Sequence, residues 1–262
     1  MNENQENNSA PKKSGGVEVV KTIILGICIV ASCVAIAFGL SMFRSGGEHS
    51  IGATGSASVD FESDLIKWGG QFKTHADTSK IAYKQIKKDA DIVRKYLENN
   101  GILPEELVFS SIDITERTKD VYDEEGNYKG YVPDGYDLSQ TVTIVSENID
   151  GVELISRDIS SLLDSGVEFT SWSPEYYYTK LDDLKLDLID QASENARERI
   201  DIIAANSDAK LGMLKNSSLG VFQITARNSG TGDYSYDGAF NISSREKTAT
   251  ITVRLEYDLK LF

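Results

Sequence analysis

Residues 247–259 read KTATITVRLEYDL and alternate apolar and polar side chains along their whole length. One face of a strand built from them would carry Ala249, Ile251, Val253, Leu255 and Tyr257, and the other face the intervening Thr, Arg and Glu. The pattern predicts a long strand that is buried on one face and solvated on the other. Such strands are typical of an antiparallel sheet covered on one side.

The chain before this strand alternates between strand and helix patterns. Strands are predicted over residues 51–61, 65–74, 109–117, 136–145, 167–179 and 211–226, and helices over 77–99, 151–165 and 180–209. In the longest helix the apolar stripe narrows to Ala192 and Ala196, and small side chains let a helix lie close to a sheet. A polar break, Glu62-Ser63-Asp64, predicts a turn between the first two strands. The order predicts an α+β fold of antiparallel sheets with helices packed on one face, including a split βαβ-like unit.

Near the N-terminus, residues 22–43 read TIILGICIVASCVAIAFGLSMF, which is 22 residues without a charge. A helix of this length measures about 33 Å and can cross a hydrocarbon core of about 30 Å. The sequence therefore predicts one transmembrane helix over residues 20–43. We expect a disordered cytoplasmic tail before it (1–19), a tether after it (44–50) and an extracytoplasmic domain over 51–262.

Two kinds of processing compete with a retained anchor. A cleaved signal peptide has a shorter apolar region, about 7–15 residues, than the one found here. Val30-Ala31-Ser32-Cys33 is similar to a lipoprotein cleavage box, so lipidation of Cys33 stays open as the alternative.

Charges beside the apolar run predict its orientation. Lys12, Lys13 and Lys21 precede the run, and only Arg44 follows it closely. Because basic residues favour the cytoplasmic side, we expect the N-terminus inside. The domain would then lie outside the plasma (inner) membrane.

Composition narrows the possible functions of residues 45–262. They carry 23 Lys and Arg against 38 Asp and Glu, a net charge of −15, so they repel nucleic acid. Both cysteines, Cys28 and Cys33, fall inside the apolar run. The domain must therefore be stable without disulfides.

No motif in the sequence predicts catalysis. The two histidines, His49 and His75, are not part of a zinc or nucleophile motif, and the glycine-rich fragment 52–56 lacks the Lys of a phosphate-binding loop. We therefore predict no catalytic, cofactor-binding or metal-binding residue, no cofactor and no enzymatic activity.

Acidic and tyrosine-rich segments remain as candidate surfaces. Carboxylates cluster in a loop (Asp120, Asp123, Glu124, Glu125) and early in the longest helix (Asp182, Asp183, Asp187, Asp190). We interpret the helical set as a solvated face near a helix N-terminus. The tyrosines gather at positions 128, 131 and 136, at 176–178, and at 234 and 236. They suit a protein–protein interface, with packing inside a sheet as the alternative.

The order of short segments resembles the SIMPL-domain family of bacterial envelope proteins. The resemblance covers residues 51–260 and rests on six segments: Gly55-Ser56-Ala57, Asp64, residues 100–107, Gly135-Tyr136, residues 162–166 and Lys210-Leu211-Gly212. Ser63 replaces the proline usual before Asp64, and Ile200 and Ile203 interrupt the alanine spacing of the long helix.

The resemblance implies an envelope protein that has no shared catalytic residues and self-associates, with a role in the response to envelope stress. From it we predict a membrane-anchored, non-enzymatic homo-oligomer. A sensory domain that binds a small molecule or a glycan stays open as the alternative function.

Overall fold

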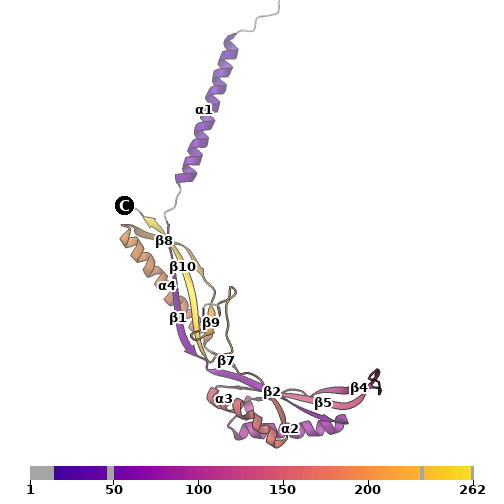
Figure 1. Cartoon of the computed structure of the whole chain (residues 1–262). Coiled ribbons are helices and arrows are strands. Elements are labelled where there is room, and N and C mark those ends of the chain that lie inside the picture. Colours follow the sequence, from indigo (N-terminus) through magenta and orange to yellow (C-terminus); the bar gives the residue numbers. More distant parts are fainter. Residues whose placement is uncertain (1–14, 46–49, 231–232, 261–262) are drawn as a thin grey trace, which may run out of the picture.

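The computed structural model describes residues 15–45, 50–230 and 233–260. It confirms the α+β class, with antiparallel sheets and an N-terminal apolar helix, α1 (Gly15–Ser45), that is longer than predicted (Figure 1). The predicted tail before Gly15 and the centre of the predicted tether, residues 46–49, lie outside the described residues. After α1 the chain builds two lobes, each with its own sheet and its own apolar core.

The first lobe, here the terminal lobe, contains both ends of the domain. Its central strand is β10 (Glu246–Lys260), which pairs with β1 (Ser50–Glu62) along one edge. The other edge of β10 is shared by β8 (Lys210–Leu219) and β9 (Gln223–Ala226). The helix α4 (Leu181–Asn206) packs on β1 and β10. The alternation of residues 247–259 therefore does mark the strand on which this lobe is built.

The predicted buried face of β10 is confirmed. Residues Ala249, Ile251, Val253, Leu255 and Tyr257 are each at most 8 % exposed and face α4. At about 25 cal/mol per Å² of apolar area, burying such a row supplies much of the stability of the lobe.

Gly55 lets α4 touch the backbone of β1. A Cβ atom on Gly55 would lie 2.2 Å from the carbonyl oxygen of Ala192 and 2.3 Å from the nitrogen of Ala196. Both alanines are fully buried. The small side chains predicted to bring this helix close to a sheet do so here.

Side chains of α4 also bond the edge of β1. The carboxamide of Asn195 accepts the N–H of Ser56 at 3.3 Å, and Arg199 donates to the carbonyl oxygen of Thr54 at 2.8 Å. Among the described strands, β1 pairs with β10 alone. The helix thus satisfies backbone groups that an edge strand would otherwise offer to another chain.

The second lobe, here the inserted lobe, interrupts the first between β1 and α4. Its strands are β2 (Leu65–Ala76), β3 (Leu107–Phe109), β4 (Asp113–Tyr122), β5 (Tyr128–Ser146), β6 (Glu168–Ser171) and β7 (Glu175–Tyr177). Its helices are α2 (Ser79–Asn99) and α3 (Ile149–Asp158), and α3 continues as a 3₁₀ turn over Ile159–Ser165. Both helices pack against the same sheet (Figure 1).

The inserted lobe contains two interlocked split βαβ units. The strand order is β3-β5-β2-β6, and β4 extends β3 along the same edge of β5. Since every pair is antiparallel, β2 and β3 run parallel with β5 between them, and β5 and β6 run parallel with β2 between them. With α2 and α3 as the crossovers, this is the ferredoxin-like arrangement, and the predicted split unit is confirmed.

The predicted break at residues 62–64 does separate the first two strands, but it does not join them into a hairpin. β1 pairs with β10 and β2 pairs with β5, so the polar break carries the chain from one sheet to the other. A break in an alternating pattern marks where a strand ends, and it does not say which strand is its partner.

Two helix patterns are also corrected. The apolar stripe predicted for residues 77–99 consists of Ala82, Ile86, Ala90, Val93 and Leu97 and leaves Asp89 outside it, but in α2 Asp89 is buried and Ala90 is half-buried. In the predicted helix 151–165, the apolar spacing places Leu154 and Leu163 on one face with Ile155, Ile159 and Leu162, but both leucines are exposed. Leu154 lies on the outer side of α3, and Leu163 lies in the 3₁₀ turn that follows Asp158.

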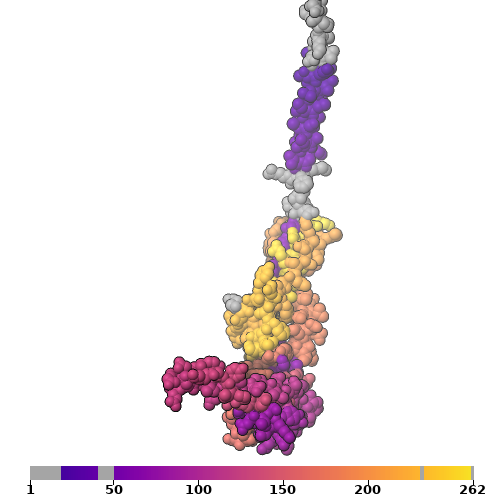
Figure 2. All heavy atoms as spheres, turned by 90° about the vertical axis from the view of Figure 1, so that its right-hand side faces the viewer, coloured from indigo at the N-terminus to yellow at the C-terminus, as the bar shows by residue number. Residues whose placement is uncertain are grey.

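Residues 119–135 are predicted from their charged, glycine-rich sequence to form a hairpin tip or a long loop, and the structure shows a hairpin that is mostly strand. β4 and β5 stay paired as far as Tyr122 and Tyr128. The pairing of β5 with β2 begins only at Tyr136, so residues 128–135 of β5 pair with β4 and not with β2. Residues 117–135 therefore form a two-stranded arm, and Figure 2 shows it projecting from the inserted lobe. All residues of β4 are exposed.

We expect Gly55→Ala to lower the free energy of unfolding by more than about 2 kcal/mol, because the new methyl group collides with the backbone of α4. Denaturant unfolding of the solubilised protein measures the loss. Gly52→Ala is the matched control, since its Cβ would lie 3.3 Å from the carbonyl oxygen of Leu255. An equal loss at the two glycines would contradict the assigned role of Gly55.

Candidate functional site

Polar side chains gather where the two lobes meet. Arg245, just before β10, donates to the carboxylates of Glu62 at the end of β1 and of Asp150 in α3. Its partners thus come from both lobes. The hydrogen bond to Asp150 raises the pKa of the Arg245 guanidinium, which stays charged at any physiological pH.

Among the residues that the structure describes, Lys247 is the only buried lysine. Its side chain is 2 % exposed and donates a hydrogen bond to the carbonyl oxygen of Tyr176 in β7. Burial lowers the pKa of the Lys247 ammonium from 10.5 to about 8. Lys247 occupies the buried face of β10, two residues before Ala249. The alternating pattern of the strand therefore predicts that position 247 is buried.

Asp64 makes a further polar contact at the junction between the lobes. Its two carboxylate oxygens accept the N–H and the hydroxyl of Thr179, each at 2.7 Å, just before α4 begins. The neighbouring Ser63 is buried and donates its backbone N–H to the carbonyl oxygen of Arg245 at 3.0 Å. A proline at this position could not make that bond. We interpret the whole junction as a structural clamp between the lobes.

A polar cavity of about 340 Å³ lies at one end of the inserted lobe. It is lined by Lys73, Thr74, His75, Gln85, Asp89, Arg117, Asp137, Gly166 and Glu168. Nδ1 of His75 lies 2.6 Å from a carboxylate oxygen of Asp137. Of the two histidines, His75 thus has a carboxylate partner, and His49 lies outside the described residues.

Asp89 is the buried charge of this cavity. The carboxyl group is 3 % exposed and accepts one hydrogen bond from the amide of Gln85 at 2.7 Å. Burial raises the pKa of Asp89. Sequence reasoning missed this residue, although the spacing of Ala82, Ile86 and Val93 leaves position 89 on the buried stripe.

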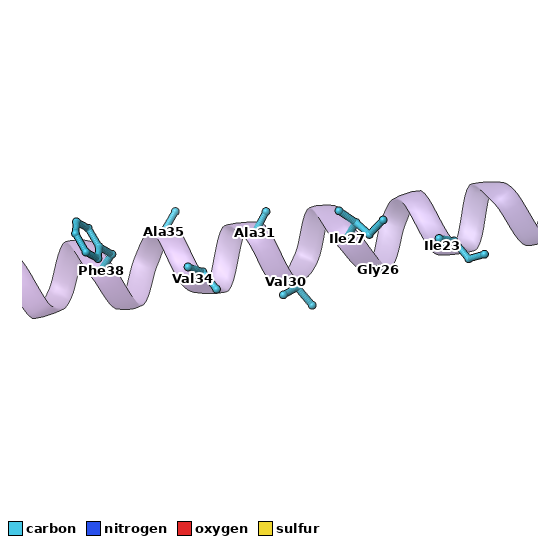
Figure 3. Close-up of a pocket in the computed structure, with 8 residues that line it drawn as sticks. All are labelled: Ile23, Gly26, Ile27, Val30, Ala31, Val34, Ala35 and Phe38. Carbon is cyan, nitrogen blue, oxygen red and sulfur yellow. The ribbon is translucent and has the colours of Figure 1, made fainter.

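A second hollow, of about 710 Å³, runs along α1. Figure 3 shows that its lining residues, from Ile23 to Phe38, all belong to this one helix and are all apolar. A wall without polar groups cannot orient a ligand, so we assign no binding site here.

The predicted acidic clusters make local contacts. In the arm, Asp123 accepts the N–H of Asn127 at 2.7 Å, which lowers the pKa of its carboxyl group, and pairs with Lys129 at 3.1 Å. In α4, Asp182 pairs with Lys185 at 3.3 Å. Within residues 15–45, 50–230 and 233–260, no group of three or more His, Cys, Asp or Glu could hold a metal ion.

The predicted tyrosine surface divides into two kinds. Tyr176 and Tyr177 are half-buried in β7, and the ring of Tyr178 packs at a tilt against that of Phe61, with centroids 4.9 Å apart. These residues pack the junction. By contrast, the tyrosines of the arm are open to solvent: Tyr122, Tyr128 and Tyr131 are 58 %, 56 % and 70 % exposed.

We expect the stability of wild type relative to Lys247→Met to rise from pH 8 to pH 10.5, by up to about 3 kcal/mol. The folded-state pKa, about 8, lies below the unfolded value of 10.5, so the unfolded chain binds more protons in this window. Below pH 8 the difference between the two proteins should be constant.

Denaturant unfolding of both full-length proteins at several pH values measures this difference. Lys80→Met is the control, because Lys80 is exposed. A difference between wild type and Lys247→Met that does not vary with pH would contradict the assignment of a buried amine.

Comparison with known families identifies the family of the chain. The model of a family described as SIMPL, a protein of unknown function (DUF541), matches residues 51–257. The match runs through both lobes, from β1 to Tyr257 in β10. No curated protein matches the chain. The family resemblance of the sequence is thereby confirmed.

Proposed function

The chain belongs to the SIMPL family, and from this premise we propose a membrane-anchored, non-enzymatic envelope protein whose extracytoplasmic domain self-associates. The anchor is α1. Its segment Val19–Leu40 has a mean hydropathy of 2.8, and none of it is buried against the rest of the chain. An apolar helix of 22 residues that is exposed throughout is long enough to cross a membrane.

Charge supports the orientation in this proposal. Lys12, Lys13 and Lys21 lie on the N-terminal side of the uncharged run, and the acidic domain follows it. The basic side faces the cytoplasm. The domain then lies outside the inner membrane, where a role in the response to envelope stress would be exerted.

The arrangement of polar groups supports a non-enzymatic role. The most buried charges, Lys247 and Asp89, lie in different lobes, and Lys247 bonds the backbone of the other lobe. Arg245 and Asp64 are likewise engaged in contacts between the lobes. Groups used in this way hold a structure together and are not positioned around a common reactant.

The exposed arm is the observation that carries self-association. A two-stranded ribbon has no core of its own and is marginally stable in water. This arm keeps three tyrosines more than half exposed, and the register places them on one face, with Tyr122 opposite Tyr128 and Asp120 opposite Tyr131. Exposed tyrosines on a projecting element are typical of recognition surfaces.

We expect the full-length protein in detergent to have a native mass that is a multiple of 28.8 kDa. Light scattering combined with size exclusion measures the protein mass. A chain in which residues 20–43 are replaced by an uncharged leucine-rich span is the control, and it should keep the same mass if the domain drives association. A single 28.8 kDa species at micromolar concentration would contradict the proposal.

The cavity around Asp89 favours a second candidate function, a sensory domain for a small molecule. Its lining combines buried and exposed carboxylates with Lys73 and Arg117, which suits a small zwitterion or a hydroxyl-rich molecule such as a sugar. If this function is right, amino acids or monosaccharides should raise the thermal unfolding midpoint of wild type. Asp89→Asn should remove that rise, and Asp91→Asn, on the exposed side of α2, should keep it. No rise with any compound of these classes would argue against it.

A further inference from the structure

The end of the arm is strongly acidic. Residues 120–129 carry four carboxylates (Asp120, Asp123, Glu124, Glu125) and one lysine, Lys129, which pairs with Asp123. The edge-to-face pair of Tyr122 and Tyr128, with centroids 5.8 Å apart, lies beside them. We call residues 120–129 the arm tip. It combines negative charge with an exposed aromatic pair.

The first half of α2 carries the opposite charge. Residues 80–88 carry four lysines and no acidic residue: Lys80, Lys84, Lys87 and Lys88. All four are exposed, and within the part of the chain that the structure describes no carboxylate lies within 4 Å of them. Two apolar side chains, Ile81 and Tyr83, are exposed among them. In a chain with a net charge of −14, this basic face is an exception.

The stability of α2 does not explain these lysines. A helix N-terminus disfavours positive charge, yet no acidic residue occupies the first turn of α2. Lysines spaced three or four apart, as at positions 80, 84, 87 and 88, repel one another along the helix. The basic face therefore costs the helix some stability, and an external acidic partner would offset that cost.

The arm tip of the same molecule lies too far away to be this partner. Ala76, just before α2, pairs with Tyr136, which in turn pairs with Glu116, so α2 begins near the base of the arm. The tip begins four residues beyond Glu116 and turns after Tyr122, six residues or about 20 Å farther along an extended strand. Figure 2 shows the arm projecting away from the rest of the inserted lobe.

We infer that the arm tip of one copy docks on the basic face of α2, residues 80–88, of a second copy. This inference rests on the proposed self-association and assigns its surfaces. Carboxylates of the tip meet the four lysines, and the Tyr122–Tyr128 pair covers Ile81 and Tyr83. The lysines can also contact the aromatic rings of the arm tip. Within α2, Lys87 lies 5.5 Å from the ring centroid of Tyr83, which is a contact of the same kind.

This contact joins two different surfaces, so a single contact leaves one copy with a free tip and the other with a free basic face, unless the two copies make the contact reciprocally. Such head-to-tail contacts generate closed rings or open chains. Because the attraction is electrostatic and near the surface, salt weakens it, and self-association should fall as the ionic strength rises above about 0.15 M.

Charge reversal on each surface tests the contact in the full-length, detergent-solubilised protein. Glu124→Lys with Glu125→Lys on the tip, or Lys84→Glu with Lys87→Glu on α2, should each weaken self-association at least tenfold by mass photometry or light scattering. The quadruple variant, with both surfaces reversed, should recover to within about threefold of wild type. Recovery also shows that the double variants had not merely unfolded.

The control variant changes the net charge by the same amount as the tip variant, at a site outside both proposed surfaces. Asp187→Lys with Asp190→Lys, on the exposed side of α4, should leave association unchanged. Failure of the quadruple variant to recover, or loss on only one of the two surfaces, would overturn the inference while self-association itself stands. Loss on α2 alone would instead indicate an anionic lipid surface or another acidic partner for the lysines. A monomeric wild type would overturn the proposed function and this inference together.

Discussion

The close approach of α4 to β1 at Gly55 is the contact on which the terminal lobe depends. With no Cβ at this position, the helix backbone around Ala192 and Ala196 lies directly on the strand. That places Asn195 and Arg199 within reach of the edge of β1 and brings the apolar stripe of α4 onto β10. β1 and β10 then pair over the full 13 residues of β1, and both ends of the domain are held in one sheet. The inserted lobe can occupy 113 positions between them, Leu65–Tyr177, without disturbing that sheet.

The two lobes are joined by directional polar contacts, whereas each lobe is stabilised internally by apolar burial. Arg245, Lys247 and Asp64 each make a specific bond across the junction or at its margin. Lys247 is the buried residue of the three, and a buried polar group that loses its hydrogen-bond partner costs more than the bond itself contributes. These bonds contribute to the relative orientation of the lobes.

The candidate surfaces were only partly visible in the sequence. The carboxylates at 120–125 and the tyrosines at 128 and 131 were recognised, because composition reveals them without a fold. That they share a projecting ribbon depends on how far β4 and β5 remain paired, which local pattern does not specify. Asp89 and Lys247 were missed because charged residues are rarely buried, although both occupy positions on the buried face of their elements.

The sequence by itself determined the apolar helix, the α+β class, the buried face of β10 and the small residues of α4, because each depends on a period of two or 3.6 or on an uncharged run. The tertiary structure alone decided that β1 and β2 belong to different sheets, that a complete βαββαβ lobe is inserted between them, and that an acidic arm stands apart from a basic helix. Strand pairing joins residues far apart in the chain, such as Ser50 with Asp258, and the energy of those contacts is not encoded in any local window.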